Sequence, residues 1–386
     1  MINDPGMQKA FVARPPIKPS GSVTAIKIIG AVFAGMVALL LGLIVLLLIG
    51  VETGPLPFLI GMVSATLPVP FYLMLVLWID RYEAEPFWML ATAFFWGALV
   101  AVFFAFLINT VSGVAVSLMT NSMRAGRTFG AVISAPIVEE CAKALILLIF
   151  FLWKKDEFDG VIDGIVYAAM AGLGFAMTEN IQYYGRAVME GGGTLTFVFI
   201  LRGALAPFSH PMFTSFTGIG LGLARQSRSM AVKLIAPPMG LLAAISMHSI
   251  WNGSGVLFGG GAFVLTYIVI MIPAFFIMLA VIALALRREG QVVRDFLVAD
   301  YQGGLFTPDE YKRLCSITGR MGSSFNAFSR GGLGHWRTAR QLNQAASELA
   351  FHRSRVARGI SAADAREREA AYRSNMEELL KRLRSK

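Results

Sequence analysis

Charged residues are scarce in this chain of 386 residues: Asp, Glu, Lys and Arg make up 15% of it, against 56% hydrophobic residues. Soluble globular domains contain about a quarter charged residues, so the composition excludes an ordinary cytosolic enzyme. It also excludes a disordered protein, which would be polar and poor in aromatic residues. The composition therefore predicts a membrane protein with several spans.

Cysteine is nearly absent, since the chain contains only Cys141 and Cys315. These two residues stand in different surroundings and predict neither a disulfide framework nor a paired-cysteine zinc site. Three motifs that mark known classes of membrane protease are also missing, namely His-Glu-x-x-His, Gly-x-Gly-Asp and Gly-x-Ser-Gly. Any peptide hydrolysis by this chain must therefore use other groups.

Long apolar stretches, in contrast, recur along the chain. A membrane-spanning helix needs about 20 apolar residues. Stretches of that size occur at about 25–50, 57–79, 87–117, 130–153, 160–184, 194–224, 232–252 and 261–286. We therefore predict an all-α polytopic membrane helical bundle of about eight transmembrane helices, the sixth of them interrupted by Pro207 and Pro211.

Basic residues predict the orientation of the bundle, because Lys and Arg favour cytoplasmic loops. They gather before the first span and in alternate later loops: Lys9, Arg14, Lys18, Lys27, Arg81, Lys154, Lys155, Arg225, Arg228 and Lys233. We predict that both termini are cytoplasmic.

The predicted domains are a cytoplasmic N-terminal segment (1–24), a transmembrane domain (25–286) and a basic, mostly helical cytoplasmic C-terminal tail (287–386). The tail holds 19 Lys or Arg and 11 Asp or Glu, a net charge of +8 out of +10 for the whole chain. The lipid bilayer explains such a tail more simply than nucleic acid does, so we expect no nucleic-acid partner.

Within the tail, Thr307 to Glu310 has the pattern of a capped helix start, and Ser361 with Asp364 predicts a last helix reaching about Arg384. The Gly- and Ser-rich stretch 322–334 predicts a flexible linker. We expect the tail to be a solvated appendage near the membrane surface.

Four predicted spans carry polar residues that are costly at membrane depth and that by default indicate function. From the cytoplasmic helix ends these residues lie roughly 21–28 Å into the membrane, at about 1.5 Å rise per residue. That range is one layer in the outer half of a hydrocarbon core of about 30 Å. We therefore predict a single shared site formed by Glu139, Glu140, Lys143, Glu179, His210, His248 and Asn252.

Spacing within the fourth span suggests different roles for its ionisable residues. Glu139 and Lys143 are four residues apart, so the lysine is expected to pair with that carboxylate. Glu139 and Glu140 point about 100° apart on a helix, so we expect one to face the cavity and the other to hold structure. Outside this cluster, Arg202, Asp159 and Asp163 are predicted to be structural or interfacial.

Two chemistries fit these residues. A carboxylate in an apolar site beside a second carboxylate becomes a competent base for water, and His248 with Asn252, four residues apart, could stabilise the developing oxyanion. Alternatively, metal ligands drawn from the two histidines and the glutamates (Glu139, Glu140, Glu179, His210, His248) could bind a Zn²⁺ ion with an open water position. The spacing leaves both chemistries open.

The four motifs resemble those of PrsW-type intramembrane proteases, distant relatives of the CAAX prenyl endopeptidases. They are Glu-Glu-x-x-Lys (139–143), Phe-x-x-x-Glu (175–179), His-x-x-Phe-Thr (210–214) with a following glycine-rich turn (218–222), and His-x-x-x-Asn (248–252), within a motif core of about 135–255. Glu179 stands where the CAAX enzymes have a histidine, which favours the PrsW branch.

The resemblance implies a multi-pass enzyme of a bacterial-type cytoplasmic (inner) membrane whose site is lined by the polar residues of these motifs. It also implies a membrane-anchored protein substrate, cut near the extracytoplasmic face as in the first cleavage of an anti-sigma factor. Two alternatives are a catalytically silent scaffold or receptor of the same fold and a proton-coupled transporter. Against the transporter, the two halves of the chain show no correspondence.

Overall fold

The computed structural model describes residues 21–359 and 364–384, and these residues form helices and no strands. The predicted segment before residue 21 and the predicted helix start at Ser361 lie outside the described residues. The chain begins with α1 (Gly21–Thr53), α2 (Pro55–Thr66), α3 (Val69–Ile79), α4 (Phe87–Phe95), η1 (Trp96–Ala101), α5 (Val102–Thr120), α6 (Met123–Phe129), η2 (Gly130–Ser134) and α7 (Ala135–Trp153). It continues with α8 (Val161–Glu190), α9 (Gly192–Phe199), η3 (Ile200–Leu205), α10 (Ser209–Gln226), α11 (Met230–Thr266), η4 (Tyr267–Met271), α12 (Ile272–Gln302), α13 (Pro308–Leu314), α14 (Ile317–Ala357) and α15 (Ala365–Arg384).

The prediction of an all-α polytopic membrane bundle is confirmed. Six stretches of the described chain are long and apolar enough to cross a membrane, the last of them a 73-residue stretch from Met230 to Gln302. That stretch is divided at Gly259, whose φ of 80° is readily adopted only by glycine. Helix α7, which carries three ionisable residues, is not among the six. Adding α7 and dividing the last stretch at Gly259 gives the eight predicted helices.

Helix α8 is the centre of the bundle, and every residue from Val161 to Ala176 on it is buried. Its closest partner is α10, with which it packs backbone against backbone at Gly164 and Gly218. A Cβ atom on either glycine would collide with the carbonyl oxygen of the other. Small residues allow this close approach between membrane helices. The packing holds the α8 and α10 motifs side by side.

The tail is more ordered than the sequence predicts. As expected, α13 starts at a capping box, in which Thr307 Oγ1 accepts from the Glu310 amide at 3.3 Å and Glu310 Oε2 accepts from the Thr307 amide at 2.8 Å. The predicted flexible linker at 322–334 is wrong, because these residues are helical within α14 except for a break at Gly331 and Gly332. The side chains of this stretch are exposed or partly exposed, and its helix follows from the capped start of α14, where Ser316 Oγ accepts from the Gly319 amide at 3.1 Å.

The tail also docks on the membrane bundle, which corrects the expectation of a solvated appendage. Arg355 of α14 pairs with Glu83 at 2.5 Å, and Arg358 pairs with Asp159 at 2.7 Å. Asp163, near the start of α8, accepts hydrogen bonds from the backbone amides of Asp159 and Gly160 at 2.7 and 2.6 Å. The structural and interfacial roles predicted for the two aspartates are therefore those observed.

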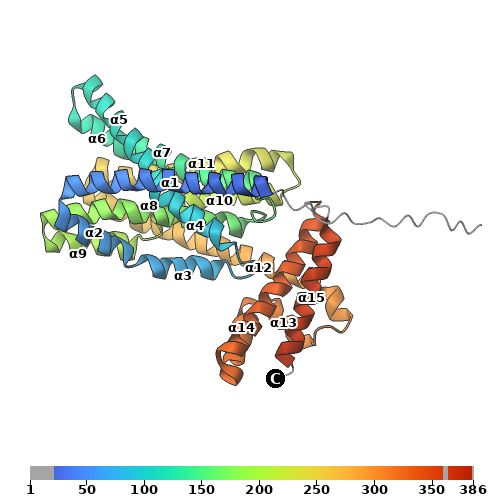
Figure 1. Cartoon of the computed structure of the whole chain (residues 1–386). Coiled ribbons are helices and arrows are strands. Elements are labelled where there is room, and N and C mark those ends of the chain that lie inside the picture. Colours follow the sequence, from blue (N-terminus) through green and yellow to red (C-terminus); the bar gives the residue numbers. More distant parts are fainter. Residues whose placement is uncertain (1–20, 360–363, 385–386) are drawn as a thin grey trace, which may run out of the picture.

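The two ends of the bundle differ. The beginning of α1 and the helices α13 to α15 lie at one end, whereas α2, α9 and the hairpin of α5 and α6 lie at the other (Figure 1). Gly191, between α8 and α9, is therefore at the end opposite the tail.

Candidate active site

Glu140 is a buried carboxylate whose hydrogen-bonding capacity is largely used by three side chains. Its Oε1 accepts from Lys143 Nζ at 2.6 Å and lies 3.0 Å from His248 Nδ1, and its Oε2 accepts from Thr214 Oγ1 at 2.8 Å. The Lys143 partner is therefore Glu140, three residues away, and not Glu139 as the spacing predicts. Thr214 on α10 and His248 on α11 hold the Glu140 carboxylate within reach of the lysine. Glu140 is therefore the more fully hydrogen-bonded of the two glutamates.

Glu139 is the contrasting carboxylate of the pair. It is 5% exposed, and its Oε2 atom is buried without a hydrogen-bond partner among the described residues. The Nε2 atom of His248 lies 3.9 Å from this oxygen, which is too far for a hydrogen bond. A buried polar atom without a partner is costly and usually indicates a role beyond stability. Glu139 thus lies near His210 and His248 with a carboxylate oxygen that no described residue engages.

His210 connects the α7 and α8 motifs. Its Nε2 atom lies 3.0 Å from Glu179 Oε2, and its Nδ1 atom lies 3.1 Å from Lys143 Nζ. Glu179 is also ion-paired with Arg202, whose Nε donates to Asn180 Oδ1 at 2.5 Å. The carboxylate of Glu179 thus bridges a histidine of the cluster and an arginine at its edge.

The two histidines meet at the centre of the cluster. The ring centroids of His210 and His248 are 5.0 Å apart. One potential ligand atom from each histidine and one from Glu139 all lie within 4.8 Å of one another, and the three residues are buried. Two imidazoles and one carboxylate are a known catalytic zinc ligand set, and the unpaired Glu139 oxygen fits a ligand role. Glu140 at His248 Nδ1 resembles the carboxylate that commonly orients a metal-binding histidine.

Asn252 makes a different contact from the one predicted. Asn252 lies one helical turn after His248 on α11, and its side-chain amide donates to the backbone carbonyl of Ala131 at 2.9 Å. Ala131 belongs to η2, directly before α7. In this structure Asn252 therefore ties α11 to the start of the helix that carries the glutamates.

A break in the sixth apolar stretch places His210 at the beginning of a helix. The chain leaves the π-helical turn η3 at Leu205 and re-enters helix at Ser209, as Pro207 and Pro211 predict. Tyr72 and Tyr267 donate hydrogen bonds to the carbonyls of Gly203 and Leu205, which the break leaves without helical partners. Gly172 of α8 lies where any Cβ would press on the backbone of His210 and Pro211. The site is thus built on a helix start packed against α8.

Two residues of this arrangement were missed as site residues. Arg202, predicted to be structural, pairs with Glu179, and Thr214 was recognised only as part of a motif. An arginine in an apolar stretch requires a counter-charge, and Glu179 is a carboxylate within the preceding predicted span. That requirement was the available sequence signal for Arg202.

Comparison with known proteins gives one family. A profile described as "PrsW family intramembrane metalloprotease" matches residues 85–278, a range that includes all the predicted site residues. A "Protease PrsW" of Geobacillus kaustophilus is 36% identical over 146 residues, which are 38% of this chain and 58% of that protein. The Oceanobacillus iheyensis protein of the same name is 27% identical over 233 residues, covering 60% and 97% of the two chains.

A third relative, "Protease PrsW" of Bacillus subtilis, is 34% identical over 152 residues, covering 39% of this chain and 63% of that protein. No solved structure gives a significant match to this chain. The resemblance that the four motifs indicate is confirmed by these matches.

Proposed function

Because this chain belongs to the PrsW family of intramembrane metalloproteases, we propose that it is an endopeptidase that hydrolyses a peptide bond of a membrane-anchored protein. The observation that carries the proposal is the pair of adjacent glutamates in opposite environments. Glu140 is held by Lys143, Thr214 and His248, whereas Glu139 keeps a buried oxygen without a partner. A structural ion pair alone would not need the second carboxylate.

Glu139 is the proposed water-activating carboxylate. In a buried setting a carboxylate binds a proton more readily than in water, and it can take the proton of an attacking water molecule as the bond to the carbonyl carbon forms. Glu140 cannot serve this role as readily, since its oxygens are engaged by Lys143 and Thr214. Glu140 instead orients His248 through Nδ1 and leaves its Nε2 directed toward Glu139.

In the alternative chemistry the same carboxylate is a ligand and not the free base: Glu139, His210 and His248 would then hold a metal ion, and Zn²⁺ is the ion that we propose for this donor set. When bound, such an ion lowers the pKa of a coordinated water and polarises the peptide carbonyl. Lys143 and Arg202 balance the charge of Glu140 and Glu179, and these two carboxylates hold His248 and His210, whereas Glu139 Oε2 has no hydrogen-bond partner among the described residues.

We further propose that cleavage occurs near the extracytoplasmic face, with both termini in the cytoplasm of a bacterial-type cell. The support is the distribution of Lys and Arg, together with the position of the tail and of the Gly191 loop at opposite ends of the bundle. A membrane-anchored anti-sigma factor, cut in a first regulatory cleavage, is the substrate class that the family resemblance suggests.

The proposal is tested with purified full chain in liposomes that also contain a candidate single-span substrate. Wild-type protein should cleave the substrate, and Glu139→Gln should abolish cleavage while the protein remains folded. A folded wild-type protein that cleaves no membrane-anchored candidate, under conditions in which a relative does so, would instead favour a silent scaffold. Metal content is measured on the same samples, because loss of metal from Glu139→Gln identifies Glu139 as a ligand.

A further inference from the structure

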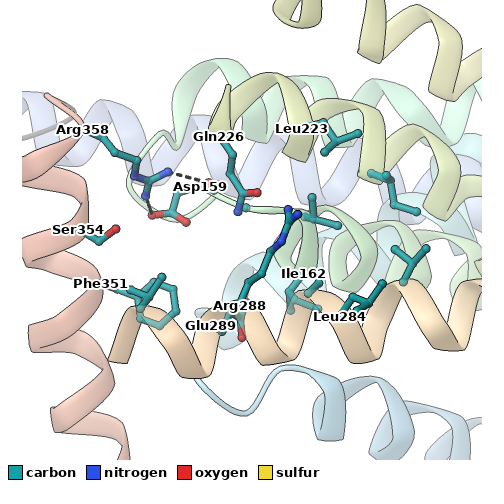
Figure 2. Close-up of a pocket in the computed structure, with 16 residues that line it drawn as sticks. Asp159, Ile162, Leu223, Gln226, Leu284, Arg288, Glu289, Phe351, Ser354 and Arg358 are labelled. Atoms are coloured by element: carbon teal, nitrogen blue, oxygen red, sulfur yellow. Dashed lines mark hydrogen bonds and ion pairs between the residues drawn. The ribbon is translucent and has the colours of Figure 1, made fainter. Parts of the chain in front are cut away.

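A cavity of about 480 Å³ lies where the tail meets the membrane bundle. Its walls come from the start of α8, the end of α10, the middle of α12 and the α14 helix of the tail (Figure 2). All the residues of α12 and α14 that line the cavity lie beyond the residues that the family profile matches. The cavity is formed by different residues from the candidate active site.

One side of the cavity is apolar and continuous with the outer surface of the bundle. Leu223 of α10 and Leu284 of α12 line the cavity and are 39% and 57% exposed. Both residues belong to stretches apolar enough to cross a membrane, so their exposed surface faces lipid. An occupant can therefore extend from the cavity into the bilayer, which favours an acyl chain over a water-soluble ligand.

The other side of the cavity is polar. Some of its charged side chains form ion pairs and others do not. Asp159 is paired with Arg358 at 2.7 Å and with Arg355 at 3.5 Å. Arg288 of α12 makes no ion pair or hydrogen bond with any described residue, and neither does the amide of Gln226. These two side chains point toward one another in Figure 2.

Glu289 is the remaining charged residue of the wall, and it follows Arg288 directly in sequence. Its carboxylate likewise has no hydrogen bond or ion pair within the described part of the chain. The cavity thus offers an unpaired guanidinium with a neighbouring amide, and an unpaired carboxylate that lies close to the α12 backbone (Figure 2). A guanidinium binds phosphate through directed, charge-assisted hydrogen bonds, and a carboxylate binds an ammonium group in the same way.

We propose that this cavity binds the headgroup of a phospholipid that carries a primary ammonium, namely phosphatidylethanolamine. Arg288 and Gln226 donate to the phosphate, Glu289 accepts from the ammonium, and an acyl chain lies along Leu223 and Leu284. Phe351 of α14 closes the cavity from the tail side. The lipid thereby joins the tail to the bundle, in addition to the pairs made by Arg355 and Arg358.

The test is native mass spectrometry of the detergent-purified full chain incubated with phosphatidylethanolamine or with phosphatidylglycerol. Wild-type protein should retain phosphatidylethanolamine in preference to phosphatidylglycerol. Arg288→Gln should weaken retention about tenfold, the effect of losing one hydrogen bond to a charged group. Arg287→Gln is the matched control, because Arg287 is the preceding residue, is also exposed and does not line the cavity.

Glu289→Gln should remove the preference for the ethanolamine lipid and leave phosphatidylglycerol bound. If Arg288→Gln does not fold, as judged by gel filtration and helical circular dichroism, Gln226→Ala provides the same comparison. Equal retention by wild type and the Arg288 or Gln226 variant overturns the proposal. A wild-type preference for phosphatidylglycerol, or the same loss in Arg287→Gln, also overturns it. None of these measurements depends on proteolysis.

Discussion

The Nδ1 atom of His248 lies 3.0 Å from Oε1 of Glu140, an oxygen that also accepts from Lys143. The other ring nitrogen of His248 lies 3.9 Å from the free oxygen of Glu139. One histidine thus separates a carboxylate that is fully engaged from one that is not. The consequences for mutation of the two glutamates differ.

Glu140→Gln is expected to lower stability more than Glu139→Gln. The Glu140 change removes the counter-charge of Lys143, which is fully buried, and breaking one side of a buried ion pair costs about 3–5 kcal/mol. Glu139→Gln costs less, because Glu139 Oε2 has no hydrogen bond to any described residue that the change could remove. Thermal unfolding followed by tryptophan fluorescence in detergent measures the difference. Equal melting temperatures for the two variants would contradict the assignment of Glu140 as the structural carboxylate.

Chelation is expected to stop cleavage and to release metal. The potential metal ligands in this group are Glu139, His210 and His248. The loss of one of only three ligands should strongly weaken metal binding. We expect the metal content of His248→Ala to fall well below that of wild type, measured by inductively coupled plasma mass spectrometry. His352→Ala, which changes a histidine of the tail, is the control. Full activity after complete removal of metal would leave only the glutamate mechanism.

Arg202 is expected to act through Glu179 and His210. Arg202→Gln removes the charge that holds Glu179, so activity should fall about 10–100-fold, as is typical when the partner of a site residue is lost. Arg186→Gln is the control, because Arg186 forms a more exposed pair with Glu52. If Arg202 acts only through Glu179, the double variant Arg202→Gln/Glu179→Gln will lose less activity than the product of the fold-losses of the two single variants. Independent, multiplicative losses would count against this coupling.

The docked end of the bundle is expected to lose stability as pH rises. Burial raises the pKa of Asp80 from 3.8 to about 7. Between these values the folded protein keeps a proton that the unfolded chain has released, so stability decreases from about pH 4 to about pH 7. Asp80→Asn should flatten this dependence and raise the melting temperature at pH 8.

Part of the pH dependence should remain in Asp80→Asn, because burial also raises the pKa of Glu83 and Glu85. The measurement is the melting temperature of the full chain from pH 5 to pH 8. Asp156→Asn, at an exposed position of the same end, is the control. A wild-type protein that becomes more stable from pH 5 to pH 7 would contradict the prediction.

The side of cleavage follows from topology. A reporter fused after Lys386 should behave as cytoplasmic, and one inserted at Gly192 as external. The new termini of a cleaved substrate should then lie near the outer end of its span or just beyond it, as peptide mass spectrometry can determine. Cuts in the cytoplasmic third of the span would contradict the predicted depth of Glu139 and Glu179.

Much of the candidate site was predictable from the sequence because its parts are local patterns. Apolar length indicates spanning helices, and polar residues within them are too costly to be scattered at random. The motifs at Glu139, Glu179, His210 and His248 were therefore expected to meet, and the structure brings them together. The break before His210 was equally local, since Pro207 lacks the amide hydrogen that a continuing helix needs, whereas Pro211 is tolerated in the first turn of α10.

The sequence was less informative about the tail. Glycine and serine at 322–334 predict a flexible linker, because intrinsic propensity is all that a single stretch of sequence reveals. The stretch is helical as part of α14, which begins at the Ser316 cap and has most of its buried residues between Ala339 and Ser354. The pairs of Arg355 and Arg358 with Glu83 and Asp159 join residues about 200 or more positions apart, and no local spacing indicates them.

By itself, the sequence determined that this protein is a multi-span helical bundle with one shared layer of glutamates and histidines. Only the tertiary structure decided which glutamate is engaged. On an isolated helix Lys143 can reach a carboxylate three or four residues away. Thr214 of α10 and His248 of α11 hold the Glu140 carboxylate beside Lys143, and Glu139 is left free. Helix periodicity fixes which side chains lie near one another, but the neighbouring helices fix which of them pair.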